Sequence, residues 1–229
     1  MQSALALSLA ALLGESFLSS EYCRRAFTHR SVSADNNERL EYLGDSLLGF
    51  FIAEWLYKKF PSYSEGSLTR LRAHLVRKET LAEIAREQKL AEMLKLGSGE
   101  LKSGGLNRAS ILADALEAVI GAVYLAEGLQ SAKDFVLNIY ANKFENIPTV
   151  DELKDAKTRL QELLQSRGLS VPVYELKEKH GKSGKETFVI QCLVEGSEEI
   201  FSGTGASRRK AEQQVAEVAY QYFLDLYEN

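Results

Sequence analysis

The sequence has few of the features that mark secreted or membrane-spanning proteins. Two cysteines in 229 residues are too few for the dense disulfide framework of a small secreted domain. Cys23 and Cys192 lie far apart, in segments that we interpret as different domains. We therefore expect reduced thiols and a cytoplasmic protein. No long uncharged apolar run is present, so we expect no association with a membrane.

The start of the chain argues against a secretory signal peptide, and the charge balance argues against a uniformly basic nucleic-acid-binding protein. Residues 4–13 are apolar, but they are too short to cross a bilayer and lack the basic flank and cleavage site of a signal peptide. We expect an amphipathic first helix there. The formal net charge is -4, so there is no global positive field. Any binding to nucleic acid must therefore come from local basic patches.

Three carboxylates stand out in a segment that is otherwise mostly apolar. Glu38, Glu41 and Asp45 have the spacing i, i+3, i+7, which places them within about 60° of each other on one helix face. Burial of an unpaired carboxylate costs several kcal/mol, so a cation should compensate them. Structural salt bridges are the simpler interpretation, because Arg39 and other basic residues are close in the sequence.

A second apolar segment repeats this pattern. Asp114 and Glu117 are the only charges between residues 110 and 125, at i and i+3, with no local basic partner. Two such helices predict one shared cation site. Ligands that are all oxygen suit Mg²⁺ or Mn²⁺ and disfavour zinc. A di-iron helical bundle is the competing metal site, but it requires Glu-x-x-His pairs. The three histidines of the sequence, His29, His74 and His180, do not form such pairs.

The pattern of helix and turn signals divides the chain into two domains. Residues 1–147 read as helices separated by Gly, Ser and Pro, with the longest over Glu38–Lys59 and Ser67–Glu87. We predict an all-α domain there and a linker over residues 148–154. Residues 155–229 predict a small α+β domain of order α-β-β-β-α. Its expected elements are a helix at 157–166, strands at 173–179, 187–194 and 199–204, and a helix at 207–226.

The start of the last predicted helix has the composition of a phosphate-binding site. Glycines at 203 and 205 precede Ser207 as the N-cap, and Arg208 and Arg209 follow in the first turn. Backbone N–H groups, the positive end of the helix and these cations would all face an anion. The alternative is an ordinary solvated charge run.

Several of these segments together resemble bacterial ribonuclease III. NERLEYLGDSLL, residues 37–48, resembles the signature of that family, and SILADALEA, residues 110–118, resembles its second acidic motif. The α-β-β-β-α domain resembles the double-stranded RNA-binding domain. Shorter matches occur at residues 28–31, 64–66, 75–77 and 97–105, so the resemblance covers almost the whole chain.

The resemblance implies an endoribonuclease that cleaves double-stranded RNA by Mg²⁺-dependent phosphodiester hydrolysis, leaving 5′-phosphate and 3′-hydroxyl ends. Mn²⁺ is expected to substitute for Mg²⁺, and processing of ribosomal and messenger RNA is the expected role. Asp45 and Glu117 would lie closest to the chemistry, and Glu38 and Glu65 match accessory acidic positions. The implied metal ligands are Glu41, Asp45, Asp114 and Glu117.

The resemblance also implies three RNA-contacting regions in the second domain. Arg208 and Arg209, with Ser207, are assigned to phosphates across the major groove. The other two regions would read the flanking minor grooves by shape and by 2′-hydroxyl groups. Taken alone, each of these two is more simply a solvated surface. They are the polar helix face Thr158, Gln161, Glu162 and Gln165, and the hairpin tip with His180 and Lys182.

A homodimer is the expected assembly, because cutting both strands of a duplex is easiest with two sites related by a twofold axis. The apolar run within residues 47–56 supplies more apolar surface than one helix face needs for its own core. The resemblance suggests that this helix lies at the interface, with Tyr42 entering a socket on the partner. The alternative is a monomer core. The predicted interface residues are Tyr42, Leu47, Phe51 and Trp55.

Two other functions use parts of the same sequence. A regulator that binds double-stranded RNA without cutting it would share every RNA-binding feature. A helical metal-dependent phosphohydrolase of small nucleotides would share the acidic helices but leaves the second domain without a role. The presence of all four carboxylates favours cleavage over the non-cleaving regulator, and the second domain makes the phosphohydrolase of small nucleotides unnecessary.

Overall fold

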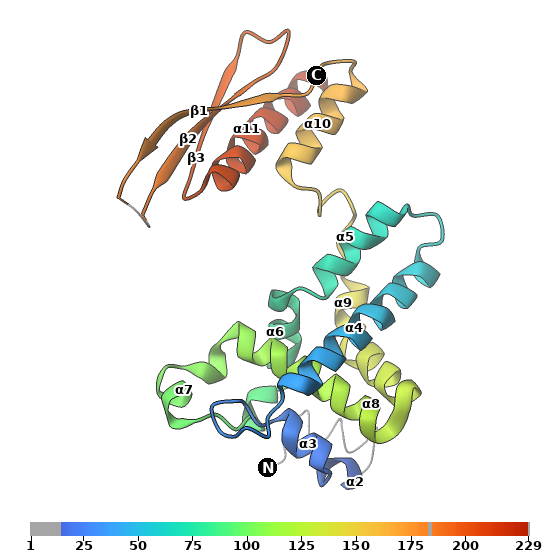
Figure 1. Cartoon of the computed structure of the whole chain (residues 1–229). Coiled ribbons are helices and arrows are strands. Elements are labelled where there is room, and N and C mark those ends of the chain that lie inside the picture. The colour runs from blue at the N-terminus through green and yellow to red at the C-terminus, as the bar shows by residue number, and fades with distance from the viewer. Residues whose placement is uncertain (1–14, 183–184, 229) are drawn as a thin grey trace. The chain divides into compact units, whose positions relative to one another are not determined.

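The computed structural model describes residues 15–182 and 185–228; the helix expected over residues 4–13 lies outside them. The chain divides into two compact units, residues 1–148 and 149–229. The described part of the first unit is helical, and the second contains a three-stranded sheet with helices (Figure 1). The predicted fold class is therefore confirmed.

The first unit is built around two long helices, α4 and α8, with shorter helices packed against them (Figure 1). Short 3₁₀ turns occur at Leu90–Glu92 and Gly105–Asn107. The α-helices described in this unit are α2 (Glu15–Leu18), α3 (Glu21–Ala26), α4 (Glu38–Lys59), α5 (Glu65–Leu75), α6 (Lys78–Glu87), α7 (Ser98–Lys102), α8 (Ala109–Ile139) and α9 (Ala141–Glu145).

Two glycines bring the backbones of α4 and α8 into direct contact. A Cβ atom at Gly44 would lie 1.8 Å from the carbonyl oxygen of Glu117, and one at Gly121 would lie 2.4 Å from the carbonyl oxygen of Leu40. Only residues without a side chain permit this approach. The two helices that carry the predicted metal ligands are therefore packed against each other at those ligands.

Helix α8 is the central core helix of the first unit. Within the described residues it is the one helix long and apolar enough to cross a membrane, but 61% of its most apolar window is buried inside the protein. Leu116, Val119, Ile120 and Val123 have no exposed surface. Gly128 interrupts the helix with a backbone φ of 84°. The apolar face of α8 thus packs against its own domain.

The single helix predicted over residues 67–87 is wrong, because the structure has two helices there. Helix α5 ends at Leu75, and Arg77 adopts an extended conformation before α6 begins. The buried Thr80 hydroxyl donates a hydrogen bond of 2.8 Å to the carbonyl oxygen of His74, which holds the break. Neither Gly nor Pro marks this position, so the helical pattern of the sequence continues through the break and did not reveal it.

The second unit is a small α+β domain in which two helices pack on one face of an antiparallel sheet (Figure 1). The strand order is β1-β2-β3. Gly203 allows α11 to lie directly on β3, because a Cβ atom there would be 2.6 Å from the backbone nitrogen of Val215. The elements are α10 (Ala156–Ser166), β1 (Val173–His180), β2 (Thr187–Leu193), β3 (Ile200–Gly205) and α11 (Arg208–Glu228).

Candidate active site

Three carboxylates from α4 and α8 meet at the contact between these helices. Glu41, Asp114 and Glu117 each offer an oxygen within 4.8 Å of the others, and all three are partly buried. Asp45 is exposed and lines the same cavity of about 350 Å³. We call Glu41, Asp45, Asp114 and Glu117 the carboxylate cluster. The structure thus brings all four predicted ligands to one cavity.

The electrostatics of the carboxylate cluster show that it is short of positive charge. Burial, then repulsion from Asp45, Asp114 and Glu41, raises the pKa of Glu117 to about 8. Burial, followed by repulsion from Asp114, also raises the pKa of Glu41. Within residues 15–182 no salt bridge neutralises any member of the cluster. A proton or a metal cation is therefore needed to balance it at neutral pH.

Three basic residues from two parts of the chain act on Asp114 through their charge. Burial raises its pKa, and the charges of Lys78, His29 and Arg30 oppose that rise. Lys78 lines the cavity of about 350 Å³ with the carboxylate cluster, which we call the Lys78 cavity. None of these three basic residues was predicted from the sequence to belong to the site, although the matching segments at residues 28–31 and 75–77 lie at or beside them.

A second cavity, of about 300 Å³, shares Glu41 and Asp114 with the first and is also lined by residues that precede them on their helices, Glu38 and Ile111. We call it the Arg30 cavity, since Arg30 lines it together with His29, Glu38 and Arg108. Glu41 and Asp114 line both cavities. The predicted accessory residue Glu38 faces this second cavity, with its Oε1 3.2 Å from Nη1 of Arg30.

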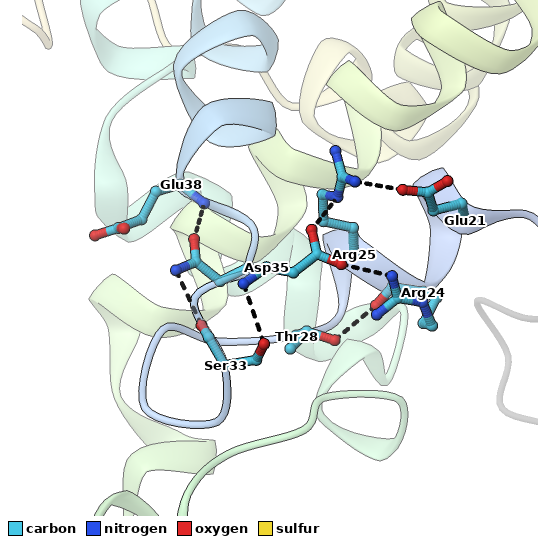
Figure 2. Close-up of polar contacts among 8 residues, drawn as sticks. Glu21, Arg24, Arg25, Thr28, Ser33, Asp35 and Glu38 are labelled. Atoms are coloured by element: carbon cyan, nitrogen blue, oxygen red, sulfur yellow. Dashed lines mark hydrogen bonds and ion pairs between the residues drawn. The ribbon is translucent and has the colours of Figure 1, made fainter.

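A polar network holds the loop that precedes α4 (Figure 2). The Asp35 carboxylate forms ion pairs of 2.6 Å with both Arg24 and Arg25 of α3. The hydroxyl of Thr28 donates to the carbonyl oxygen of Arg24 at 2.7 Å. This network anchors both ends of the loop that carries Arg30, so it positions one wall of the Arg30 cavity.

Glu65 does not join the carboxylate cluster. It lies at the start of α5 and accepts a hydrogen bond of 2.9 Å from the hydroxyl of Thr69. It lines a third cavity, of about 470 Å³, with Tyr57, Tyr63 and Arg72. Within one chain, Glu65 is thus separate from the other predicted acidic residues.

The predicted interface residues on α4 differ in their exposure. Tyr42 is 79% exposed, and Leu47 is partly buried. Trp55 stacks on Phe144, with ring centroids 3.8 Å apart. The prediction for Phe51 is wrong, because its side chain is 1% exposed and belongs to the core. The side chain of the neighbouring Phe50 is 56% exposed and lies at the surface instead.

The second unit displays the predicted RNA-contacting residues at its surface. Ser207 caps α11, since its hydroxyl accepts a hydrogen bond of 3.2 Å from the backbone nitrogen of Lys210. Arg208 and Arg209 are exposed in the first turn, and Arg208 donates to Glu212 at 2.9 Å. Other predicted residues at or near the surface are Thr158, Gln161, Glu162 and Gln165 on α10, His180 at the end of β1, and Lys182 in the following loop.

Two of these residues have ion-pair partners of their own. Glu162 pairs with Lys154 at 2.6 Å, and His180 contacts Glu178 at 2.6 Å. The glutamate side chain of each pair is substantially exposed, so both interactions are weak. A bound ligand can therefore replace them.

Comparison with known proteins gives matches over both units. A family model described as Ribonuclease-III-like matches residues 19–144, and one described as Double-stranded RNA binding motif matches residues 156–223. A 2.2 Å crystal structure of the nuclease domain of ribonuclease III from Campylobacter jejuni is 38% identical, with a TM-score of 0.57. That match covers 62% of this chain and 97% of that one.

A second structure of the same Campylobacter jejuni domain is 37% identical, with a TM-score of 0.55. It covers 59% of this chain and 99% of that chain, and it is described as showing structural flexibility in a region involved in dimer formation. Both matches thus span nearly all of that nuclease domain.

Proposed function

Because this chain belongs to the ribonuclease III family and is an endoribonuclease, we propose that it cleaves double-stranded RNA at the carboxylate cluster, with the help of a divalent metal ion. The observation that carries this proposal is the meeting of Glu41, Asp114 and Glu117 within 4.8 Å, with no salt bridge to them in the described residues. The RNA-binding motif over residues 156–223 supplies the substrate class.

The donor set fits a hard divalent cation. The ligands are carboxylate oxygens only, which is the chemistry of Mg²⁺ and Mn²⁺ sites. Glu41, Asp45, Asp114 and Glu117 would hold the ion, and Asp45 and Glu117 would be nearest the reaction. When bound, Mg²⁺ supplies a water of lowered pKa and neutralises charge on the phosphate in the transition state.

The residues of the chain prepare the site for that ion. Glu117 has the pKa of about 8, so in the absence of a cation it holds a proton at neutral pH. A cation in the cluster favours the ionised form and releases that proton. Contact between α4 and α8 at Gly44 and Gly121 fixes the carboxylates before RNA arrives, which lowers the cost of organising the transition state. Hydrolysis is proposed to leave 5′-phosphate and 3′-hydroxyl ends.

The second unit is proposed to supply most of the affinity for the duplex. Arg208 and Arg209, at the capped start of α11, would contact phosphates across the major groove. The exposed face of α10 and the loop after β1 would contact the flanking minor grooves. Precursors of ribosomal and messenger RNA in the cytoplasm are the proposed substrates.

A second copy of the chain is the proposed partner. Tyr42 projects from α4 with 79% of its surface exposed, and the cavity beside Tyr57 offers a mostly apolar recess of about 470 Å³. An exposed aromatic side chain and an apolar recess on the same domain suit a twofold interface, in which each copy provides both. Glu65, which lines that cavity, would then lie at the interface.

We expect cleavage to depend on both duplex structure and divalent metal. A long RNA duplex incubated with the protein should be cut in Mg²⁺ or Mn²⁺ and remain intact in EDTA, as followed by denaturing gel electrophoresis. A single-stranded RNA of the same length is the control and should be cut far more slowly. Binding of the duplex without any cutting in Mg²⁺ would instead favour the non-cleaving regulator.

We expect the double substitution Arg208→Ala and Arg209→Ala to weaken duplex binding at every RNA sequence. Loss of two phosphate contacts should reduce the slope of log K against log salt by about 2. Fluorescence anisotropy over a range of KCl measures both quantities. Lys177→Ala, at an exposed position on β1, is the matched control. An unchanged salt slope would show that these arginines do not contact RNA.

We expect Tyr42→Ala to weaken dimer formation by at least about tenfold, since large aromatic anchors dominate the affinity of many interfaces. Sedimentation velocity at several protein concentrations measures this. Leu129→Ala is the control, because Leu129 is 51% exposed on α8 beyond the kink at Gly128. If the parent protein is already monomeric at micromolar concentration, the proposed dimer is wrong.

A further inference from the structure

Two cavities, each lined by cationic side chains, share walls with the carboxylate cluster. Glu41 and Asp114 form part of the wall of both the Lys78 cavity and the Arg30 cavity. An RNA strand carries one negative charge per nucleotide, so the carboxylates alone repel the phosphates on either side of the bond to be cut. The cations of the two cavities offset that repulsion.

Lys78 is placed to meet an anion and not to neutralise the cluster. It is exposed at the first position of α6, and in the described part of the chain it forms no salt bridge within 4.0 Å. It nevertheless lines the Lys78 cavity and acts on Asp114 through its charge. A flexible ammonium group that stays apart from nearby carboxylates remains available to a phosphate entering the cavity.

Arg30 has the corresponding place in the other cavity. Its side chain is 70% exposed, and its salt bridge is with Glu38 at 3.2 Å, which is also exposed. Such a pair is weak and opens readily. The other cations of this cavity are held more firmly: Arg108 donates to both Glu100 and Ser103, and the ring of His29 is bonded to Ser31. Arg30 is therefore the cation of that cavity that can move to a ligand.

We propose that the cleaved RNA strand crosses the carboxylate cluster with one flanking phosphate bound by Lys78 and another, on the opposite side of the scissile phosphate, bound by Arg30. This inference rests on the proposed function of the cluster. The two residues fix the direction and register of the strand, so they act mainly on the rate of cleavage. Overall affinity for the duplex comes mainly from the second unit.

The test combines two charge-removing substitutions, Lys78→Gln and Arg30→Gln, with RNA duplexes that carry one neutral methylphosphonate linkage. The neutral linkage is moved along the cleaved strand on both sides of the scissile bond. Single-turnover cleavage in Mg²⁺ at saturating protein gives the rate, and gel-shift titration in EDTA gives the affinity. Each substitution should slow cleavage by about tenfold and change the affinity by less than about twofold.

The position of the neutral linkage identifies the contact. For the parent protein, one linkage on each side of the scissile bond should slow cleavage. Lys78→Gln should be insensitive to the neutral linkage on one side only, and Arg30→Gln to the linkage on the other side only. Such non-additivity is the mark of a direct interaction. Lys78→Arg should restore most of the rate, because it restores the positive charge.

Lys59→Gln is the matched control, since Lys59 is exposed at the last residue of α4, about 21 Å along the helix from Asp45. It should cleave at the parental rate. Equal sensitivity of the parent and both variants to every neutral linkage would overturn the inference. If that equal sensitivity is found while the parent cleaves and Glu117→Gln does not, the proposed function stands and only the strand path is removed. A parent that does not cleave would instead remove the proposed function.

Discussion

Glu117→Gln is expected to lower the rate of double-stranded RNA cleavage by about 10³-fold while leaving affinity for the duplex within about twofold of the parent. Glutamine keeps the volume of the side chain but removes a negative charge that faces Glu41 and Asp114 within 4.8 Å. Loss of one group that holds a metal ion and stabilises the transition state costs several kcal/mol. Duplex affinity persists because the proposed main contacts are in the second unit.

The matched control is Glu127→Gln, the same chemical change at an exposed position of α8. It should cleave at the parental rate. Cleavage rate and gel-shift affinity are measured on one duplex for all three proteins. Near-parental cleavage by Glu117→Gln would show that this carboxylate is not a catalytic ligand.

Glu117→Gln should also change how the stability of the folded protein depends on pH. Burial and like charges raise the pKa of Glu117 in the folded protein from its ordinary value of 4.5 to about 8. The folded state therefore binds this proton more tightly, and the resulting stability is fully present below about pH 4.5 and lost as the pH rises through 8. In EDTA at pH 9, Glu117→Gln should melt several degrees above the parent, and at pH 5 the difference in melting temperature should shrink.

Mg²⁺ should raise the melting temperature of the parent more than that of Glu117→Gln. Thermal melts followed by circular dichroism measure all of these differences.

Gly44→Ala is expected to destabilise the first unit by about 3–5 kcal/mol, enough to prevent stable folding of many domains. The new Cβ would lie 1.8 Å from the carbonyl oxygen of Glu117 and 3.1 Å from the backbone nitrogen of Gly121. Both obstacles are backbone atoms of the central helix, so α4 and α8 must move apart. That movement would also separate Glu41 from Glu117 and reduce cleavage in any protein that still folds.

Gly49→Ala is the control for this substitution, because it lies on the same helix and its Cβ would have no neighbour within 4 Å. Alanine is a better helix former than glycine, so Gly49→Ala should leave the protein as stable or more stable by up to about 1 kcal/mol. Urea denaturation followed by circular dichroism compares the two. Equal stability of both variants would mean that the close contact of α4 and α8 is not required.

Local sequence patterns determined the elements of this protein and much of its candidate site. The helix expected over Glu38–Lys59 is α4 with the same bounds, since a long periodic segment bounded by a proline break leaves little choice. The α-β-β-β-α order of the second unit was also predictable, because alternation and helical periodicity differ in each segment. The spacing of Glu38, Glu41 and Asp45 on one helix and of Asp114 and Glu117 on another predicted one shared cation site, and the family resemblance gave the four ligands.

Tertiary structure decided the features that depend on which residues approach from elsewhere in the chain. Phe51 rather than Phe50 is buried because of where α4 meets the core. Lys78 and Arg30 lie beside the carboxylates only after α6 and the loop before α4 pack against α8. No local pattern contains this information, because Arg30, Lys78 and Asp114 belong to three separate segments that only folding brings together. The backbone contact of α4 with α8 at Gly44 and Gly121 likewise joins segments more than 70 residues apart.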